Sequence, residues 1–446
     1  MSSDVPACVA LRNQVPADWD VPALASVTDF QEGPGILAKD FRNSGVPLLR
    51  LRNIETPAVQ LGGCNFLDPE LVAKRWRHFG LAEGDFLIST SASLGRVSVV
   101  GPDAVGAIPY TGIIRFRSAS PKLHHKYLRA FLSSSAFIQQ AEQMATGSVI
   151  RHFGPSHLRQ MAIALPPLDE QLHIAEVFDV LDARVALLRE TNSTLEAIAQ
   201  ALFKSWFVDF DPVRAKQQGL APAGMDEATA ALFPEGFEES GVGPVPKGWP
   251  PGTLNDLAAL NSQSWSARTH PERVRYLDLA NVKANEINAV IEFAFEEAPS
   301  RARRALRSGD TLVGTVRPGN RSFAFIDKPV AHLTASTGFA VLSPRAVENT
   351  AFVYLSATQD LSIERLAHVA DGGAYPAVRP DVVSALACVV PPTAVLCVFN
   401  AAARPLLEQV SGNQRQAQTL VTLRDTLLPR LISGQLRLPE AAALMA

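Results

Sequence analysis

Two polar loops that contain arginine recur at matched positions, each between two short apolar segments. The first, TSASLGR, contains Thr90, Ser91 and Arg96, and the second, TVRPGNR, contains Arg317 and Arg321. Small residues let backbone N–H groups approach a phosphate, and an arginine side chain binds either a phosphate or the edge of a guanine. The same residues also suit ordinary hairpin turns with an exposed arginine. Nucleic-acid contact and a plain turn are therefore both open interpretations.

A second polar loop follows later in each half of the chain. These loops are TGSVIRH, residues 146–152, and GGAYP, residues 372–376. The candidate contacts in and just after them are Ser148, Arg151, His152, Tyr375 and Arg379. They extend the set of expected DNA contacts, with ordinary turns again as the alternative.

Clusters of basic residues precede the two Gly-Asp pairs of the chain. KRWRH contains Arg75 and Arg77, and RARRALR contains Arg303 and Arg304. A run of charge usually marks a solvated face, and its recurrence at equivalent places keeps contact with phosphate open as a second interpretation.

Motifs of common enzymes are missing from the sequence. It contains no G-x-x-x-x-G-K-[ST] phosphate loop and no G-x-S-x-G nucleophile turn. Its nine histidines form no H-E-x-x-H or Cys/His array. We therefore expect a protein without a catalytic centre, a metal or a cofactor of its own.

Composition places the chain among ordinary globular proteins. It has 446 residues, of which 47% are hydrophobic and 19% charged, and a net charge of −3. The total does not favour nucleic acid, but a local basic patch suffices for binding. Four cysteines without a C-x-x-C pair indicate a reducing compartment. Without a membrane-length apolar run or a signal peptide, we expect a cytoplasmic location.

The chain also contains a long internal repeat. Gly84-Asp85-x-Leu-Ile-x-Thr returns as Gly309-Asp310-x-Leu-Val-x-Thr, at an offset of 309 − 84 = 225 residues. The same offset relates two Pro-Pro pairs, at 166–167 and 391–392. Solenoid units repeat every ~20–50 residues. This repeat is therefore a duplicated globular domain with a helix, and it predicts an internal two-fold and a paired partner.

A leucine pattern of period 3.5 follows each Pro-Pro pair and predicts two long helices that pair as an antiparallel coiled coil. Polar Asn192 and Asn413 interrupt the apolar seam, where a buried asparagine can fix register or is a tolerated defect. The expected seam residues are Leu181, Leu188, Leu195, Leu202, Trp206, Leu406, Leu420 and Leu427.

The predicted fold class is α+β, with two domains of mixed α/β structure separated by these helices. The expected order is a domain at 14–167, a helix at 168–207, a linker at 208–244, a second domain at 245–391 and a second helix at 392–434. The linker is rich in Pro, Gly and acid, and is long enough to run back along the first helix.

Several segments resemble one known family. LPPLDEQLHIAEVFDVLDARVALLRETNSTLEAIAQALFKSWFVDFDPVRAK, residues 165–216, resembles the first conserved region of type I restriction–modification specificity subunits. GDFLIST and ATGSVIRHF resemble parts of that family's target-recognition domains, and LRDTLLPRLISGQL, residues 423–436, resembles the end of its second conserved region. The resemblance covers nearly the whole chain.

The resemblance implies a non-catalytic subunit that reads a bipartite, asymmetric sequence in double-stranded DNA. It further implies docking of two modification subunits, which use S-adenosylmethionine to methylate adenine, and a possible association with ATP-dependent restriction subunits. Base contacts vary most within the family, so none is transferred to a numbered residue. The alternative function is a structural coiled-coil adaptor whose duplicated domains bind protein.

One departure from the repeat bears on docking. Glu170 and Gln171 open the first helix, but the residues at offset 225 are Val395 and Leu396. If the acidic-Gln element contacts a modification subunit, the two docking sites are unequal.

Overall fold

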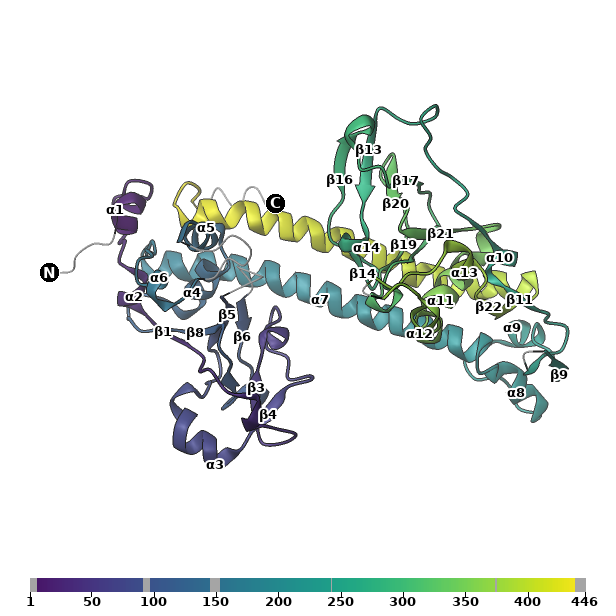
Figure 1. Cartoon of the computed structure of the whole chain (residues 1–446), viewed down its shortest axis with the longest axis horizontal. Coiled ribbons are helices and arrows are strands. Elements are labelled where there is room, and N and C mark those ends of the chain that lie inside the picture. The colour runs from purple at the N-terminus through teal and green to yellow at the C-terminus, as the bar shows by residue number, and fades with distance from the viewer. Residues whose placement is uncertain (1–5, 91–96, 145–152, 242, 374, 438–446) are drawn as a thin grey trace. The chain divides into compact units, whose positions relative to one another are not determined.

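The computed structural model describes residues 6–90, 97–144, 153–241, 243–373 and 375–437 (Figure 1). The chain forms two compact units, the first from residues 1–187 and 417–446, the second from residues 188–416. Two 40-residue helices, α7 (Leu168–Phe207) and α14 (Thr393–Ile432), each contribute to both units.

The first unit contains two four-stranded sheets, ordered β1-β8-β5-β6 and β2-β4-β3-β7. All pairs in the first sheet are antiparallel, and β3 runs parallel to β7 in the second. The elements are α1 (Pro6–Arg12), α2 (Leu24–Val27), β1 (Thr28–Glu32), β2 (Phe41–Arg42), β3 (Val46–Leu49), β4 (Asn65–Leu67), α3 (Pro69–Leu71), β5 (Phe86–Ser89), β6 (Val97–Val99), β7 (Ile108–Pro109), β8 (Ile113–Ser118), α4 (His125–Leu132), α5 (Ser135–Met144) and α6 (Pro155–Leu158).

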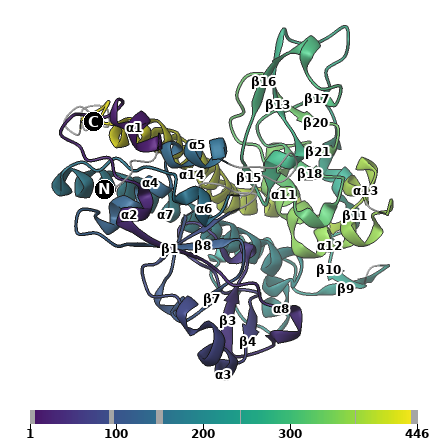
Figure 2. The same ribbon diagram turned by 60° about the vertical axis from the view of Figure 1, so that its left-hand side comes forward.

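The second unit also has two four-stranded sheets, ordered β12-β21-β18-β19 and β16-β13-β20-β17 (Figure 2). The first of these matches β1-β8-β5-β6 and is likewise antiparallel, whereas the parallel pair of the second sheet, β13 and β20, is central and not at the edge. Its elements are α8 (Asp211–Gln217), α9 (Glu227–Ala231), β9 (Phe237–Ser240), β10 (Gly243–Pro246), β11 (Pro251–Thr253), α10 (Leu254–Leu257), β12 (Ala258–Leu260), β13 (Arg273–Leu277), β14 (Val282–Lys283), β15 (Glu286–Ile287), β16 (Ile291–Ala294), β17 (Ala302–Ala305), β18 (Thr311–Gly314), β19 (Phe323–Phe325), β20 (Leu333–Ser336), β21 (Phe339–Pro344), α11 (Thr350–Thr358), α12 (Asp360–Val369), α13 (Pro380–Ser384) and β22 (Ala387–Val389).

The repeated Gly-Asp pair forms the same turn in both units. Gly84 and Gly309 have φ angles of 82° and 90°, which a residue with a side chain rarely adopts. Asp85 and Asp310 each accept a hydrogen bond of 2.8 Å from the main-chain N–H three residues earlier. Each turn therefore starts a buried strand, β5 or β18, at the same point of its sheet.

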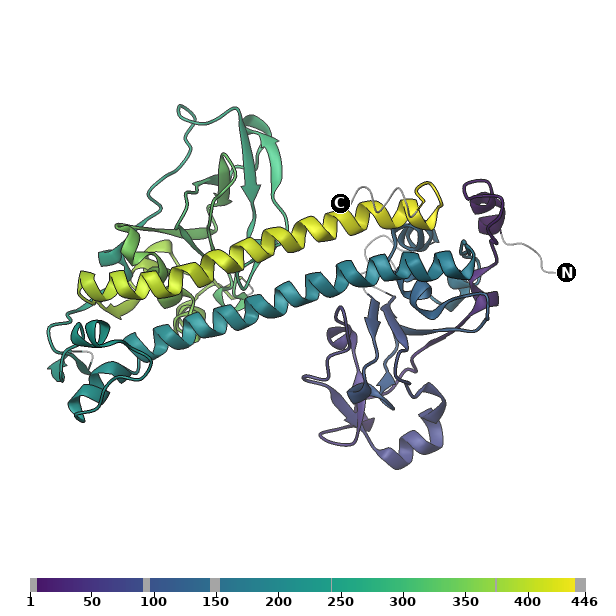
Figure 3. The ribbon, with the colours of Figure 1, turned by 180° about the vertical axis from the view of Figure 1, so that it is seen from behind.

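The two long helices pack together in each unit and run in opposite directions there (Figure 3). In the first unit, Phe178 of α7 shares a core with Leu427 of α14, and in the second, Phe203 of α7 shares a core with Phe399 of α14. Residues early in α7 thus meet residues late in α14, and the reverse. The prediction of mixed α/β domains with two long paired helices is confirmed.

The segment predicted as a linker is folded and does not run back along the first helix. Residues 208–244 form α8, α9 and the β9–β10 hairpin. Phe210 and Phe233 are buried in one core with Trp206 at the end of α7 and with Trp249. Its aromatic residues, rather than its Pro and Gly content, decide where this segment lies, because burying them removes apolar surface from water.

Candidate nucleic-acid interface

The second unit has a concave, basic surface between its loops, which we call the Arg317 hollow. Its lining includes Lys283, Arg317, Asn320, Arg321 and Tyr375. The structure thus brings together three residues that the sequence placed in two separate loops, Arg317, Arg321 and Tyr375.

The backbone fixes both loops of the hollow. Arg317 and Arg321 have φ angles of 48° and 60° and flank a short 3-10 turn at Pro318–Asn320. The Arg317 N–H donates a 2.7 Å hydrogen bond to the carbonyl of Pro376, which ties the first loop to the second. Left-handed conformations are costly for residues with a side chain, so they persist only where the surroundings impose them.

Arg317 and Tyr375 present a stacked pair at the surface. The guanidinium carbon lies 4.5 Å from the centre of the Tyr375 ring, and Tyr375 is 69% exposed. An exposed aromatic ring with a cation on it is suited to stacking on a base and to contact with phosphate.

A third segment adds Lys283, which the sequence analysis missed. β14 and β15 are joined by Ala284 and Asn285, whose φ angles of 44° and 66° are those of a two-residue type I′ turn. The turn holds exposed Lys283 on the wall of the hollow. The asparagine of VKANEI, a residue that turns favour, was the available signal for this turn.

Two other predicted arginines have carboxylate partners at the surface. Arg321 forms a 2.7 Å ion pair with Asp360, and Arg379, whose side chain is 82% exposed, forms a 2.9 Å pair with Asp381. Exposed ion pairs contribute little to stability. A phosphate can therefore replace either carboxylate at small cost.

The two basic clusters, which the sequence placed at equivalent positions, have different structures. Lys74–Arg77 lies in helical turns, where Arg75 and Arg77 are exposed, but Arg303 and Arg304 lie on strand β17 and outside the hollow. The Arg303 guanidinium carbon lies 4.8 Å from the ring centre of Phe295. Burial lowers the pKa of Arg304, and its Nε has no hydrogen-bond partner within the described ranges. The two clusters are therefore not structural equivalents.

Thr90 is corrected from a DNA contact to a scaffold residue. It is 0% exposed, and its hydroxyl donates a 3.2 Å hydrogen bond to the carbonyl of Gly112. Thr315, at offset 225, makes the equivalent bond to Gly338 at 2.8 Å. The repeated threonine thus holds neighbouring loops together. The other predicted contacts of the first unit, Ser91, Arg96, Ser148, Arg151 and His152, lie outside the described residues.

The expected seam residues differ in burial. Leu181, Leu188, Trp206 and Leu427 are buried, whereas Leu195, Leu202, Leu406 and Leu420 are half-buried. In the second helix Leu407, one residue after Leu406, is fully buried. The helix therefore faces its neighbours one position away from the predicted row at this point.

Gln171 is corrected from a docking candidate to an internal brace. It is 1% exposed and forms hydrogen bonds of 2.8 Å to main-chain groups of Lys122, His124 and Pro166. Glu170 binds Arg437 through both carboxylate oxygens at 2.9 Å. Glu170 and Gln171, which have no equivalent at the start of the second helix, thus make contacts within the first unit.

Metal-binding clusters and membrane-spanning helices are both absent from the described ranges. No group of three or more His, Cys, Asp or Glu side chains in these ranges could hold a metal ion. Each helix in the same ranges is too short or too polar to cross a bilayer.

Comparisons with known proteins agree on one family. Residues 16–197 match the model of the type I restriction modification DNA specificity domain. The chain is 23% identical to the type I restriction enzyme MjaIX specificity subunit of Methanocaldococcus jannaschii, over 96% of this chain and 95% of that protein. It is 25% identical to the HindI specificity subunit of Haemophilus influenzae, over 62% and 69%.

A solved structure supports the fold. The S subunit of a type I restriction–modification system from M. genitalium superposes with a TM-score of 0.53 at 14% identity, covering 94% of this chain and 96% of that one. Two long helices with two mixed α/β domains are thus an arrangement that specificity subunits adopt. Residues 16–197 are thus similar to the type I restriction modification DNA specificity domain, and the chain as a whole is similar to specificity subunits of type I restriction enzymes.

Proposed function

We propose that this chain is the DNA-recognition subunit of a type I restriction–modification complex and that its two mixed α/β domains read the halves of a bipartite, asymmetric target. The family supports the role. The repeat supports the reading of a different half-site by each domain. The Gly-Asp turn and the buried threonine recur in both domains, whereas the polar loop residues differ between them.

The Arg317 hollow is the observation that carries the proposal. It combines exposed Lys283 with the stacked pair of Arg317 and Tyr375 on one concave surface. Lysine and arginine contact phosphate, and arginine also reads the edge of a guanine in the major groove. These are the two kinds of contact that sequence-dependent DNA binding requires.

The proposed partners follow from the family. Two modification subunits dock on the helix pair and bind S-adenosylmethionine, restriction subunits join the assembly, and this chain supplies recognition without catalysis.

Co-expression with the modification subunit tests the proposal. We expect a complex with two copies of that subunit per copy of this chain, measured by native mass spectrometry, and sequence-dependent DNA binding by the complex. A complex that assembles but binds all DNA equally would contradict the recognition role and favour the adaptor function. Failure to associate at all would contradict the proposed partners.

A further inference from the structure

Asn285, at the turn between β14 and β15, is bonded to both long helices. Its Nδ2 donates a 2.6 Å hydrogen bond to Oε1 of Glu196 in α7. Its carbonyl accepts a 2.7 Å hydrogen bond from Nε2 of Gln414 in α14. The hairpin is therefore joined by polar contacts to each helix at once.

The remaining groups of Asn285 bind the neighbouring strand. Its Oδ1 accepts from the N–H of Phe325 at 2.9 Å, and its own N–H donates to the carbonyl of Phe323 at 2.8 Å. The residue is 2% exposed, so these bonds are shielded from water. Asparagine suits the position because it tolerates a positive φ and offers both a donor and an acceptor.

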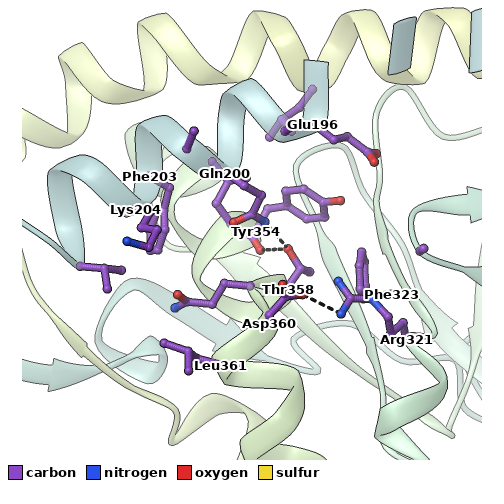
Figure 4. A pocket seen from close by; sticks show the side chains of 17 residues that line it. Glu196, Gln200, Phe203, Lys204, Arg321, Phe323, Tyr354, Thr358, Asp360 and Leu361 are labelled. Atoms are coloured by element: carbon purple, nitrogen blue, oxygen red, sulfur yellow. Dashed lines mark hydrogen bonds and ion pairs between the residues drawn. The ribbon is translucent and has the colours of Figure 1, made fainter. Parts of the chain in front are cut away.

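The β14–β15 hairpin, whose turn contains Asn285, also forms a wall of the Arg317 hollow through Lys283. Lys283 lies two residues earlier, and the N–H of Ala284 donates a 2.7 Å hydrogen bond to the carbonyl of Arg321. Behind this wall is a cavity of about 430 Å³, lined in part by Glu196, Tyr354 and Arg321 (Figure 4). Arg321 thus lines both the hollow and the cavity behind it.

The cavity separates part of the hairpin from the helices and lies beside Glu196, which Asn285 contacts. Gln200 of α7 reaches Thr358 of α11 at 3.3 Å on one side, and Arg321 binds Asp360 of α12 on another (Figure 4). Space beside Glu196 leaves the hairpin with less packing than a filled core would supply. The bonds of Asn285 to Glu196 and Gln414 supply polar contacts between the hairpin and both helices, in addition to the apolar packing of Val282 and Ile287 in the neighbouring core.

We propose that Asn285 is a positioning residue that fixes the DNA-contacting hollow of the second unit to the two long helices, and thereby helps set which spacing between half-sites is accepted. This inference rests on the proposed function. The bonds to Glu196 and Gln414 place the hairpin, the hairpin places Lys283, and the main chain of Ala284 holds that of Arg321.

An exchange of donor and acceptor tests this role in the assembled complex with its modification subunits. Asn285→Asp places a carboxylate against the carboxylate of Glu196. Adding Glu196→Gln restores a donor–acceptor pair, because an aspartate accepts from both the N–H of Phe325 and the amide of glutamine. Glu196→Gln alone keeps an acceptor for Asn285 and is the matched control.

The measured quantity is the methylation rate on the native target and on targets with one base pair more or less in the spacer. We expect Asn285→Asp to slow methylation of the native target by about tenfold or more, because misplacement of a binding group slows a reaction. We also expect it to reduce the ratio of the rate on the native spacer to the rate on the altered spacers. The double variant should return the native methylation rate and the spacer preference to within about twofold of the wild-type values. Residues that interact directly show such a rescue, whereas unrelated damage to the fold does not.

The inference is overturned if folded Asn285→Asp matches the wild type in both readouts, or if the double variant is no better than the single one. Should Asn285→Asp not fold, Asn285→Gly keeps the turn and removes the side chain, with the same expected loss and with wild-type behaviour again overturning the inference. A wild-type complex without any sequence preference would instead contradict the proposed function, so the two failures are distinguishable.

Discussion

Asn413 of α14 donates a 2.8 Å hydrogen bond from Nδ2 to Oδ1 of Asn192 in α7, within the buried seam of the second unit. Asn192 in turn donates to the carbonyl of Val410 at 3.2 Å, and Gln409 donates to Oδ1 of Asn413 at 2.8 Å. Neither asparagine recurs at offset 225, where Asn192 corresponds to Ala417 and Asn413 to Leu188. The pair therefore favours one alignment of the helices.

Replacing one member of this pair should cost more than replacing both. Asn192→Leu leaves the buried amide of Asn413 without its acceptor, which we expect to lower the free energy of unfolding by about 1–3 kcal/mol. The double change to leucine should recover much of that loss, because an apolar pair suits the seam. Urea unfolding followed by helical circular dichroism measures both; additive losses would show that the asparagines do not interact.

The first unit joins its domain to the helices through charge. Arg129 of α4 binds Asp179 at 2.8 Å and Asp182 at 2.6 Å, and Asp182 also binds Arg424 of α14 at 2.6 Å. Phe178 lies beside both guanidinium groups, at 5.1 Å from Arg129 and 5.9 Å from Arg424. At offset 225 the second unit has buried Tyr354 in place of Arg129 and buried Leu407 in place of Asp182, so the network does not recur there.

Asp182→Asn should consequently destabilise the first unit. Removing one member of a buried ionic network leaves two arginines partly unpaired, at a cost of about 3 kcal/mol. Hydrogen exchange should speed up in α4 and in the first half of α7. Asp425→Asn is the control, because Asp425 pairs with Arg424 at the exposed edge. Equal exchange in both variants would contradict a structural role for Asp182.

Lys283→Ala should weaken DNA binding by the assembled complex in a salt-dependent way. Loss of one phosphate contact reduces the slope of log affinity against log salt by about 0.9. Lys247→Ala, an exposed lysine outside the hollow, is the control and should leave the slope unchanged. Fluorescence anisotropy at several salt concentrations measures the slope. Identical slopes for both variants would remove Lys283 from the interface.

Glu196 should make the second unit less stable as pH rises. Burial raises the pKa of its carboxyl group, against the lowering effect of the hydrogen bond from Asn285. A group with a raised folded pKa binds its proton more tightly in the folded state, so its contribution is fully present below the unfolded pKa and is lost as pH increases through the folded value.

Glu196→Gln removes this dependence while keeping an acceptor for Asn285. We expect the variant to gain stability relative to the wild type as pH rises from 4 to 8, measured by urea unfolding at each pH. A difference that is constant over this range would show that Glu196 does not titrate differently in the folded and unfolded states. The charge of Asp310, whose pKa burial also raises, is common to both proteins and cancels.

Local and periodic features were predictable from the sequence. Helix α7 follows Pro166-Pro167 and contains neither Gly nor Pro, and its seven-residue leucine spacing demands a partner helix. The repeat of the Gly-Asp pair was visible in the sequence, whereas the turn that each pair forms, at a φ angle that only glycine takes without strain, came from the structure. The polar loops around Arg317 and Tyr375 were visible as breaks between short apolar segments.

Contacts between residues far apart in the sequence were not predictable. Asn285 bonds to Glu196 and Gln414, which are 89 and 129 residues away, and no local pattern marks either partner. Gln171 and Thr90 were taken for surface residues because polar side chains are mostly exposed, but main-chain groups satisfy both in the interior. The fold of residues 208–244 depends on aromatic packing against Trp206 and Trp249 that only the tertiary structure creates.

Methylome sequencing of the host with and without this gene tests the central claim most directly. If the chain is the recognition subunit, deletion should remove methyladenine from one bipartite motif and leave every other motif unchanged. Reintroducing the wild-type gene should restore that motif, and reintroducing Arg317→Ala together with Lys283→Ala should restore it weakly or not at all. A methylome that is the same with and without the gene would contradict the account.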